Sequence, residues 1–230
     1  VAWGDETLDA TPLVFNQVSF NLRNLFTRHT IRVALTPPAW MAKPLVLEGT
    51  LHGRSLAKME EWHGEAQVGI PAIDFAAWQS WLPANAARLA GHGSVSARLK
   101  LEAGQVEALT AKINLAKVAL SHPQLPAPLV LGRASGETGW ARDANHVQTA
   151  YVRGMSLGES DGTLTQAFDL AWRWGAEEQG VRARNLDLAR LATLAERMPL
   201  AEAYKSSLRQ HRPRGRVDSL EASWVLGSAN

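Results

Sequence analysis

The sequence has no cysteine, no marked excess of charge of one sign and no long apolar run. Without cysteine the chain can form no disulfide, no cysteine-ligated zinc site and no thiol nucleophile. The net charge is only +2 and positive and negative residues are interleaved. The basic face or stripe that nucleic-acid binding requires is therefore missing, and we expect no nucleic-acid partner. No apolar run approaches the ~20 residues that a membrane-spanning helix needs.

What the sequence does contain is the composition of a folded globular chain. Its 230 residues are 46% hydrophobic and 20% charged, which argues against wholesale disorder and permits a sizeable core. We expect a single β-rich segment over residues 1–230, with 1–72 and 73–230 as possible sub-units. Because the sequence opens at Val1 without a methionine, we interpret it as a piece of a longer protein or a processed product.

The clearest pattern lies between Gly93 and Leu120, where apolar and polar residues alternate along two arms that meet at Ala103-Gly104-Gln105. The apolar positions are Val95, Ala97, Leu99 and Leu101 on the first arm and Leu109, Ala111, Ile113 and Leu115 on the second. Strict alternation places these side chains on one face of a sheet and the polar ones on the other. One apolar face and one wet face are typical of an antiparallel meander rather than of a buried parallel sheet.

Segments with the same alternation, bounded by turn residues, predict further strands on both sides of this hairpin. Their expected bounds are Val14–Leu22, Ile31–Leu35, Leu45–His52, Trp62–Ile70, Leu129–Trp140, Val147–Leu157, Leu164–Trp174, Val181–Asn185 and a last strand through Leu220, Ala222, Trp224 and Leu226. We expect Pro71 to end the strand before it and Asp161-Gly162 to form a turn. Helical spacing predicts short helices near 74–82, 187–198 and 201–210. The predicted fold is mainly β: a long antiparallel curved sheet, shaped like a groove or a taco, with a few short amphipathic helices.

Two patterns could carry chemistry, and we interpret neither as a site. Gly154-Met155-Ser156-Leu157-Gly158 matches the G-x-S-x-G nucleophile elbow, which requires a strand before the serine and a helix after it. Turn residues follow the motif here, so we predict no hydrolase activity and no enzyme. His63 and Glu65 share a face of one strand and could pair or bind a metal, but a solvated polar face is the preferred interpretation. We expect no metal and no cofactor.

The nine tryptophans are unusually many. Trp78 and Trp81 share a helical face, and Trp172 and Trp174 share a strand face. Clusters of this kind usually belong to a core or close the end of a groove. A sugar-stacking platform is the functional alternative.

The last part of the sequence resembles a known family. Asn185 to Trp224 contains an "LDLARL" helix start, a "PL" break, an "L-x-x-x-x-P-R-G" exit and a strand that ends in tryptophan. Trp62-His-Gly64, the "IDFAAWQSWLP" helix and Leu131-Gly132-Arg133 match further motifs in the expected order. In this combination the chain resembles the YhdP family of AsmA-like and TamB-like envelope proteins from about Val14 to Trp224. It corresponds to an internal fragment, without the family's N-terminal membrane helix and most of its long β-rich body.

The resemblance implies a bridge-like lipid-transport protein of the Gram-negative envelope, located in the periplasm and anchored to the inner membrane by parts outside this fragment. Phospholipid acyl chains would be its partners, moving along a hydrophobic groove toward the outer membrane. The residues we expect to line that groove are Val95, Ala97, Leu99, Leu101, Ile113, Leu115, Phe168, Leu170 and Trp172. The alternative is a closed structural or carbohydrate-binding β-sandwich, because alternating strands can form either a groove or a closed core.

Overall fold

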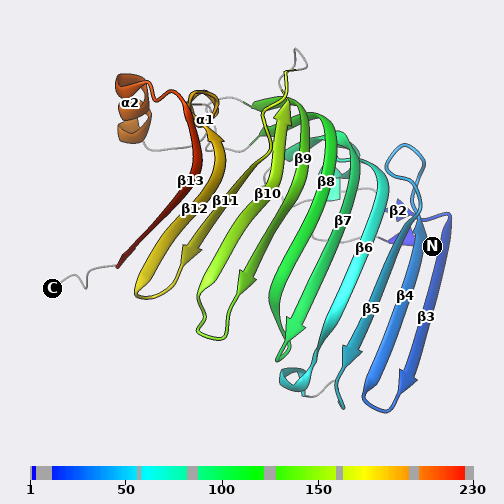
Figure 1. Cartoon of the computed structure of the whole chain (residues 1–230). Coiled ribbons are helices and arrows are strands. Elements are labelled where there is room, and N and C mark those ends of the chain that lie inside the picture. The colour runs from blue at the N-terminus through cyan, green and yellow to red at the C-terminus, as the bar shows by residue number, and fades with distance from the viewer. Residues whose placement is uncertain are drawn as a thin grey trace.

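The computed structural model describes residues 2–3, 12–55, 58–81, 88–121, 128–158, 163–196 and 202–225. The strands of the large sheet are β3 (Gln17–Leu25), β4 (Arg28–Thr36), β5 (Leu45–His52), β6 (His63–Asp74), β7 (Arg88–Glu102), β8 (Gln105–Ser121), β9 (Leu129–Arg142), β10 (Gln148–Gly158), β11 (Phe168–Trp174), β12 (Glu178–Asp187) and β13 (Arg216–Val225). These eleven strands form one open antiparallel sheet in which each strand pairs with its neighbours in the sequence (Figure 1). A separate two-stranded sheet joins β1 (Ala2–Trp3) to β2 (Leu13–Val14).

Four short helices complete the described part of the chain. They are η1 (Met59–Glu61), η2 (Ala76–Trp81), α1 (Leu188–Glu196) and α2 (Glu202–His211). No described helix is both long enough and apolar enough to cross a membrane. The architecture confirms the predicted fold class, a curved antiparallel sheet with a few short helices. The alternative prediction was a sandwich of two sheets closed on each other. The described strands form one large sheet and one small two-stranded sheet instead.

The central hairpin forms where the alternation predicted it, with longer arms than expected. Glu102 pairs with Gln105 across the turn. Ala103 and Gly104 both have positive φ angles, 50° and 70°, as a two-residue type I′ turn requires. Glycine adopts this conformation without strain, which explains the position of the turn.

Several strand ends follow the sequence pattern and others do not. The first strand was expected from Val14, but β3 begins at Gln17 and Val14 belongs to β2. β5 has the predicted bounds. The prediction that Pro71 ends its strand was wrong, because β6 continues to Asp74 through a register shift between Ile70 and Ile73. A shift of this kind leaves residues out of the ladder, so a proline without an N–H donor is tolerated there.

The strand predicted from Leu164 to Trp174 was also too long at its start. β11 begins at Phe168, and Leu164 forms only an isolated bridge with Gly158. The expected turn at Asp161-Gly162 lies outside the described residues, as do Leu226 and the last residues of the helices expected at 74–82 and 187–198.

Carboxylates cap both helices that lie near the sheet. The Asp74 carboxylate accepts a hydrogen bond from the Ala76 backbone N–H at 3.0 Å, at the start of η2. The Asp187 carboxylate accepts one from the Arg190 N–H at 3.1 Å, at the start of α1. Each satisfies a donor that the first turn of a helix leaves unpaired. The predicted helices near 74–82 and 187–198 therefore begin at the expected residues.

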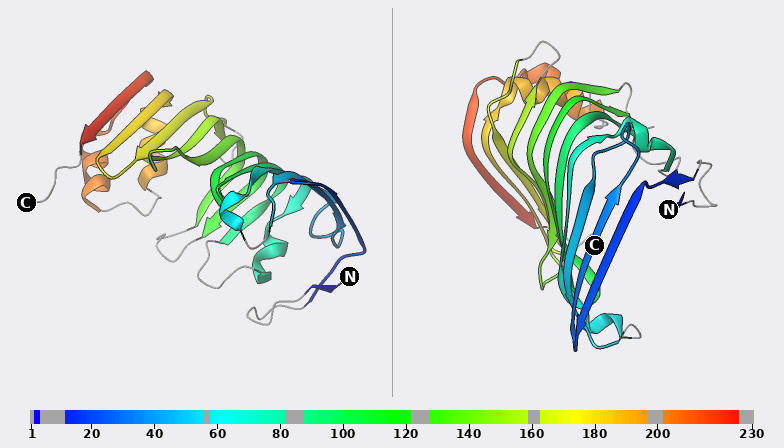
Figure 2. Two further views of the ribbon diagram at one scale, coloured as in Figure 1. Left: turned by 90° about the horizontal axis from the view of Figure 1, so that it is seen from below. Right: turned by 90° about the vertical axis from the view of Figure 1, so that its right-hand side faces the viewer.

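The sheet curves strongly, and its bends occur at defined positions. The β7–β8 register shifts between Ala90 and His92, next to Lys117, whose φ is 52°. At Gly93 φ is 157°, and a Cβ atom there would lie 2.0 Å from the Asn114 carbonyl oxygen. Bulges and glycines of this kind increase the local twist and bend a strand. Figure 2 shows the result, an arch with η2 and α1 on its inner side.

The two ends of the strands differ, and we name them from their position in Figure 1. The lower rim is the end with the hairpins β3–β4, β5–β6, β7–β8, β9–β10 and β11–β12. The upper rim is the opposite end, where η2, α1 and α2 lie. We call the face of the sheet that η2 and α1 contact the inner face, and the opposite one the outer face.

Candidate functional site

Directly paired residues continue one apolar face across the whole sheet. One row leads from Leu99 on β7 to Leu109 on β8 and Trp140 on β9. It extends on one side through Ala150, Trp172, Val181 and Ala222, and on the other through Ala66, Gly49, Ile31 and Leu22. Side chains of directly opposed residues point to the same side of a sheet. This row therefore lies on the inner face, from the first strand of the sheet to the last.

The register places every residue that the sequence predicted for a groove on this inner face. Val95 pairs with Ile113, and Leu170 pairs with Val152 on β10. The structure therefore brings the predicted residues of β7, β8 and β11 onto one continuous surface. Whether lipid contacts them stays a prediction. They do not form one uniform surface, because the upper and lower halves of the face differ in burial.

The upper half of the inner face is a conventional core. Leu115, Val118 and Ala134 are buried together, with Phe75 packed against them from the residue that precedes η2. A second buried cluster joins Met155, Phe168, Ala183 and Leu186, with Leu191 of α1 packed against it. Leu115 and Phe168, both predicted for the groove, belong to these clusters. Ile113 packs against both of them.

The lower half of the same face is open. Leu109 and Trp172 are each 43% exposed, and Leu170 is 39% exposed. At the edge of the sheet Phe20 of β3 is 63% exposed. No second sheet and no helix among the described residues packs over these side chains. Exposed apolar surface that extends over many strands exceeds the scattered apolar residues of an ordinary monomer surface.

The outer face carries charged and polar side chains in cross-strand pairs. Arg32 on β4 forms an ion pair with Glu48 on β5, and the Gln67 amide on β6 donates to the same carboxylate at 3.3 Å. Further along the sheet, Arg153 lies 3.5 Å from Glu137. These pairs are largely solvent-exposed and each contributes little to stability. Together they make the outer face wettable.

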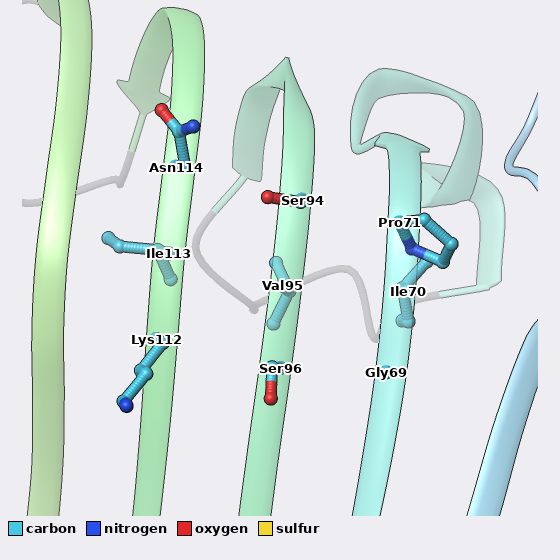
Figure 3. A pocket seen from close by; sticks show the side chains of 9 residues that line it. All are labelled: Gly69, Ile70, Pro71, Ser94, Val95, Ser96, Lys112, Ile113 and Asn114. Carbon is cyan, nitrogen blue, oxygen red and sulfur yellow. The ribbon is translucent and has the colours of Figure 1, made fainter.

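Figure 3 shows a shallow hollow of about 360 Å³ on this outer face. It spans β6, β7 and β8. Gly69 has no side chain, those of Ser94 and Ser96 are small, and the longer Lys112 lies at one side. Of the described residues that line it, only Lys112 is charged. A hollow without convergent polar or titratable groups gives no basis for assigning a catalytic site.

η2 holds two buried polar atoms that have no hydrogen-bond partner, the indole nitrogens of Trp78 and Trp81. The two rings meet edge to face, with centroids 6.3 Å apart. The helix is fixed to the sheet because the Phe75 N–H donates to the Gly91 carbonyl oxygen at 2.9 Å. The two side chains share a helical face, as the sequence predicted. That they belong to a core or close the end of a groove stays a prediction.

Ser156 lies within β10 and is followed by two more strand residues, so no nucleophile elbow forms there. Its hydroxyl donates to the backbone carbonyl oxygen of Thr165 at 2.9 Å. A hydroxyl held by a carbonyl acceptor inside a strand lacks the exposed, base-activated position of a catalytic serine.

His63 and Glu65 lie on the outer face, as the alternation predicted. The contact that the sequence did not indicate is between His63 and its cross-strand partner His52, whose rings stack with centroids 5.2 Å apart. Among the described residues no group of three or more histidine, aspartate or glutamate side chains is arranged to hold a metal ion.

The fold and its faces define a class: an open, curved antiparallel sheet with one continuous apolar face and one charged face. The YhdP protein family profile matches residues 1–229, and the chain belongs to this family. The match confirms the resemblance seen in the sequence motifs. No curated protein sequence and no solved structure matches the chain. Membership in this bridge-type family of cell-envelope proteins points to lipid transport in the bacterial envelope.

Proposed function

We propose that this chain forms a segment of a conduit that carries phospholipids across the periplasm, between the inner and outer membranes of a Gram-negative bacterium. The full-length protein would be anchored in the inner membrane through parts outside this segment, and its role would support outer-membrane integrity. The segment itself performs no chemistry and needs no cofactor. Acyl chains contact the lower half of the inner face, and the charged outer face meets water.

The observation that carries this proposal is the half-exposed apolar face that continues across all strands of the sheet. Leu109 and Trp172 are apolar, lie in one row and remain 43% exposed. An acyl chain placed on them gains roughly 0.8 kcal/mol for each methylene group removed from water. Because the strands run side by side, the row extends across the sheet and perpendicular to the strands. A lipid could therefore move from strand to strand without losing apolar contact.

The experiment compares a charge on the inner face with the same charge on the outer face of one strand. Leu99 lies on the inner face of β7, and Ser96 lies on the outer face of the same strand and is exposed. Lipid that copurifies with the chain is quantified by mass spectrometry for Leu99→Asp and Ser96→Asp. Thermal unfolding followed by circular dichroism shows whether each variant is folded.

We expect Leu99→Asp to remain folded and to lose most of its bound phospholipid, since an aspartate cannot be covered by an acyl chain without losing its hydration. Ser96→Asp should retain lipid at the level of the unchanged chain. Equal lipid content in the two folded variants, or no lipid in the unchanged chain, would overturn the proposal. Loss of folding in Leu99→Asp alone would show that the lower half is a closed core instead.

A further inference from the structure

The inner face of β9–β13 changes chemically near the lower rim. The lowest row of paired residues there contains Arg142, Gln148, Trp174, Gln179 and Trp224. The row above it contains Trp140 and Trp172 among small apolar residues, and the third row contains Thr138 and aliphatic residues. We define the aromatic rim as Trp140, Gln148, Trp172, Trp174, Gln179 and Trp224. Within three rows the face therefore changes from polar and aromatic to aliphatic.

Contacts hold the aromatic rim in place and leave hydrogen-bond donors available. The Trp140 indole N–H donates to the Gln148 amide oxygen at 3.1 Å. Trp172 and Trp224 meet edge to face, with centroids 5.5 Å apart, across the intervening strand β12. The indole N–H groups of Trp172, Trp174 and Trp224 make no hydrogen bond with another described residue. Trp172 and Trp224 are also exposed, so a ligand could reach their donors.

Tryptophan and glutamine at such a boundary suit a ligand that is apolar at one end and polar at the other. An indole ring has an apolar body and a single donor, and tryptophan is enriched where hydrocarbon meets water. From the lower rim upward, the rows of the inner face change from polar to apolar. This is the order in which a lipid leaflet changes from headgroups to hydrocarbon. β11, from Phe168 to Trp174, has seven residues. At ~3.3 Å per step it spans about 20 Å, enough for one leaflet's share, about 15 Å, of a ~30 Å hydrocarbon core.

The buried apolar clusters toward the opposite end of the same face are unsuitable for a charged group. Leu115 and Phe168 are buried there among apolar side chains. The two indole donors at that end, on Trp78 and Trp81, are enclosed. A phosphate would lose its hydration on entering this region, and burying an unpaired charge is far more costly than leaving it at an exposed rim.

We propose that the aromatic rim binds the glycerol-ester and phosphate end of a glycerophospholipid, whose acyl chains point up toward the buried clusters beside η2 and α1. This inference rests on the proposed function and adds to it the orientation of the bound lipid. The Arg142 guanidinium, on the lowest row, donates to the Gln105 amide oxygen at 2.7 Å. Its remaining donors can pair with a phosphate. The rim then fixes which end of the lipid faces water at every position along β9–β13.

The test uses two phosphatidylethanolamine probes that differ only in the position of a photoreactive diazirine. One probe carries the diazirine on its headgroup and the other carries it near the end of an acyl chain. The purified chain is loaded with each probe and irradiated, and crosslinked peptides are mapped by mass spectrometry. We expect the headgroup probe to label peptides that contain Trp172–Trp174 and Trp224. The chain-end probe should label the margin of the buried clusters, at Ile113 or Val152, whose tryptic peptides do not contain Trp172.

A pair of variants connects the labelling to the rim itself. Trp172→Leu combined with Trp224→Leu keeps both positions apolar but removes the indole rings and their donors, and headgroup labelling at the rim should fall about tenfold while chain-end labelling persists. Arg173→Ala, on the outer face of β11, is the matched control and should change neither signal. Circular dichroism confirms that both variants are folded.

The outcomes separate this inference from the function on which it rests. Headgroup labelling at η2, or headgroup labelling spread evenly over both rims, overturns the rim assignment and leaves lipid binding intact. Headgroup labelling that the double leucine variant does not reduce also overturns it. If a folded chain is labelled by neither probe, the proposed function fails and the rim assignment fails with it.

Discussion

The upper and lower halves of the inner face come from the same strands and follow the same alternation, yet only the upper half is buried. On β8, Leu115 is 4% exposed, whereas Leu109 on the same face is 43% exposed. On β11, Phe168 and Trp172 differ in the same way. What differs is the covering layer, because Phe75 and α1 pack on the upper half and no described segment packs on the lower half.

The comparison separates the two roles that apolar residues have in this sheet. Alternation determines which face a side chain occupies, but the bends at Gly93 and Lys117 and the helices that follow the strands determine whether it is buried. The upper half holds the sheet in its curved form. The lower half contributes less to folding, so its apolar surface remains available to a ligand.

The largest expected effect comes from placing a charge in each half of one strand. Leu115→Asp strands a carboxylate in the buried cluster, which should cost several kcal/mol and unfold a domain of ordinary stability. Leu109→Asp places the same charge in the exposed half and should change the free energy of unfolding by less than about 1 kcal/mol. Urea unfolding followed by tryptophan fluorescence measures both. Equal destabilisation by the two variants would contradict the division into a closed and an open half.

A smaller effect tests the bend that separates the halves. Gly93→Ala would place a Cβ atom 2.0 Å from the Asn114 carbonyl oxygen, at a φ of 157°, so we expect a loss of about 3 kcal/mol. Gly69→Ala on the neighbouring strand is the control, because nothing lies within 4 Å of its Cβ position. In thermal denaturation only Gly93→Ala should lower Tm. If Gly93→Ala leaves Tm unchanged, the bend does not depend on this glycine.

The smallest effect concerns the far edge of the sheet, where Arg182 on β12 lies 2.6 Å from Glu221 on β13. The hydrogen bond from Arg182, and then its charge, lower the pKa of Glu221 below the ordinary glutamate value. A lowered pKa stabilises the fold above the ordinary pKa, and that contribution is lost as the pH falls through the folded-state pKa. Both side chains are exposed, so the effect is small.

Glu221→Gln should therefore reduce the part of the Tm decrease that occurs on acidification below about pH 4.5. Glu177→Gln, at an exposed residue of the β11–β12 turn, should leave the acid dependence of Tm as it is. The measurement is Tm from pH 7 to pH 3 for both variants and the unchanged chain. An unchanged acid dependence in Glu221→Gln would mean that this pair does not stabilise the edge strand.

Much of the fold was predictable because alternation and turn chemistry are local. The hairpin at Ala103-Gly104 and the bounds of β5 follow directly from the sequence pattern. The strand through Pro71 was not predictable, because the register shift that tolerates this proline depends on how β6 pairs with β7. The prediction placed the start of β11 too early, because Leu164 has a side chain suited to a strand but lies outside the continuous ladder.

The candidate site was predictable in its chemistry and not in its extent. The sequence predicted that Leu99, Leu115, Leu170 and Trp172 share one face, and the register places them there. It could not predict that Leu115 lies in a closed core while Trp172 is open, because burial depends on tertiary packing of distant segments. The sequence singled out Trp172 and Trp174 but not the rest of the aromatic rim, since its tryptophans and glutamines come from five strands that only the paired sheet brings together.

The directions of the outermost described strands, β3 and β13, bear on how two copies of this segment could pair edge to edge. The described sheet has eleven strands, an odd number, so β3 and β13 run in the same direction, both toward the lower rim. A second copy added by simple translation would meet the first through a parallel pair, which is somewhat weaker than an antiparallel one. A copy rotated about a two-fold axis perpendicular to the sheet would pair antiparallel with the first. The lower rim of one copy would then adjoin the upper rim of the other. Antiparallel growth that keeps all lower rims aligned therefore needs one additional strand of opposite direction between two such units.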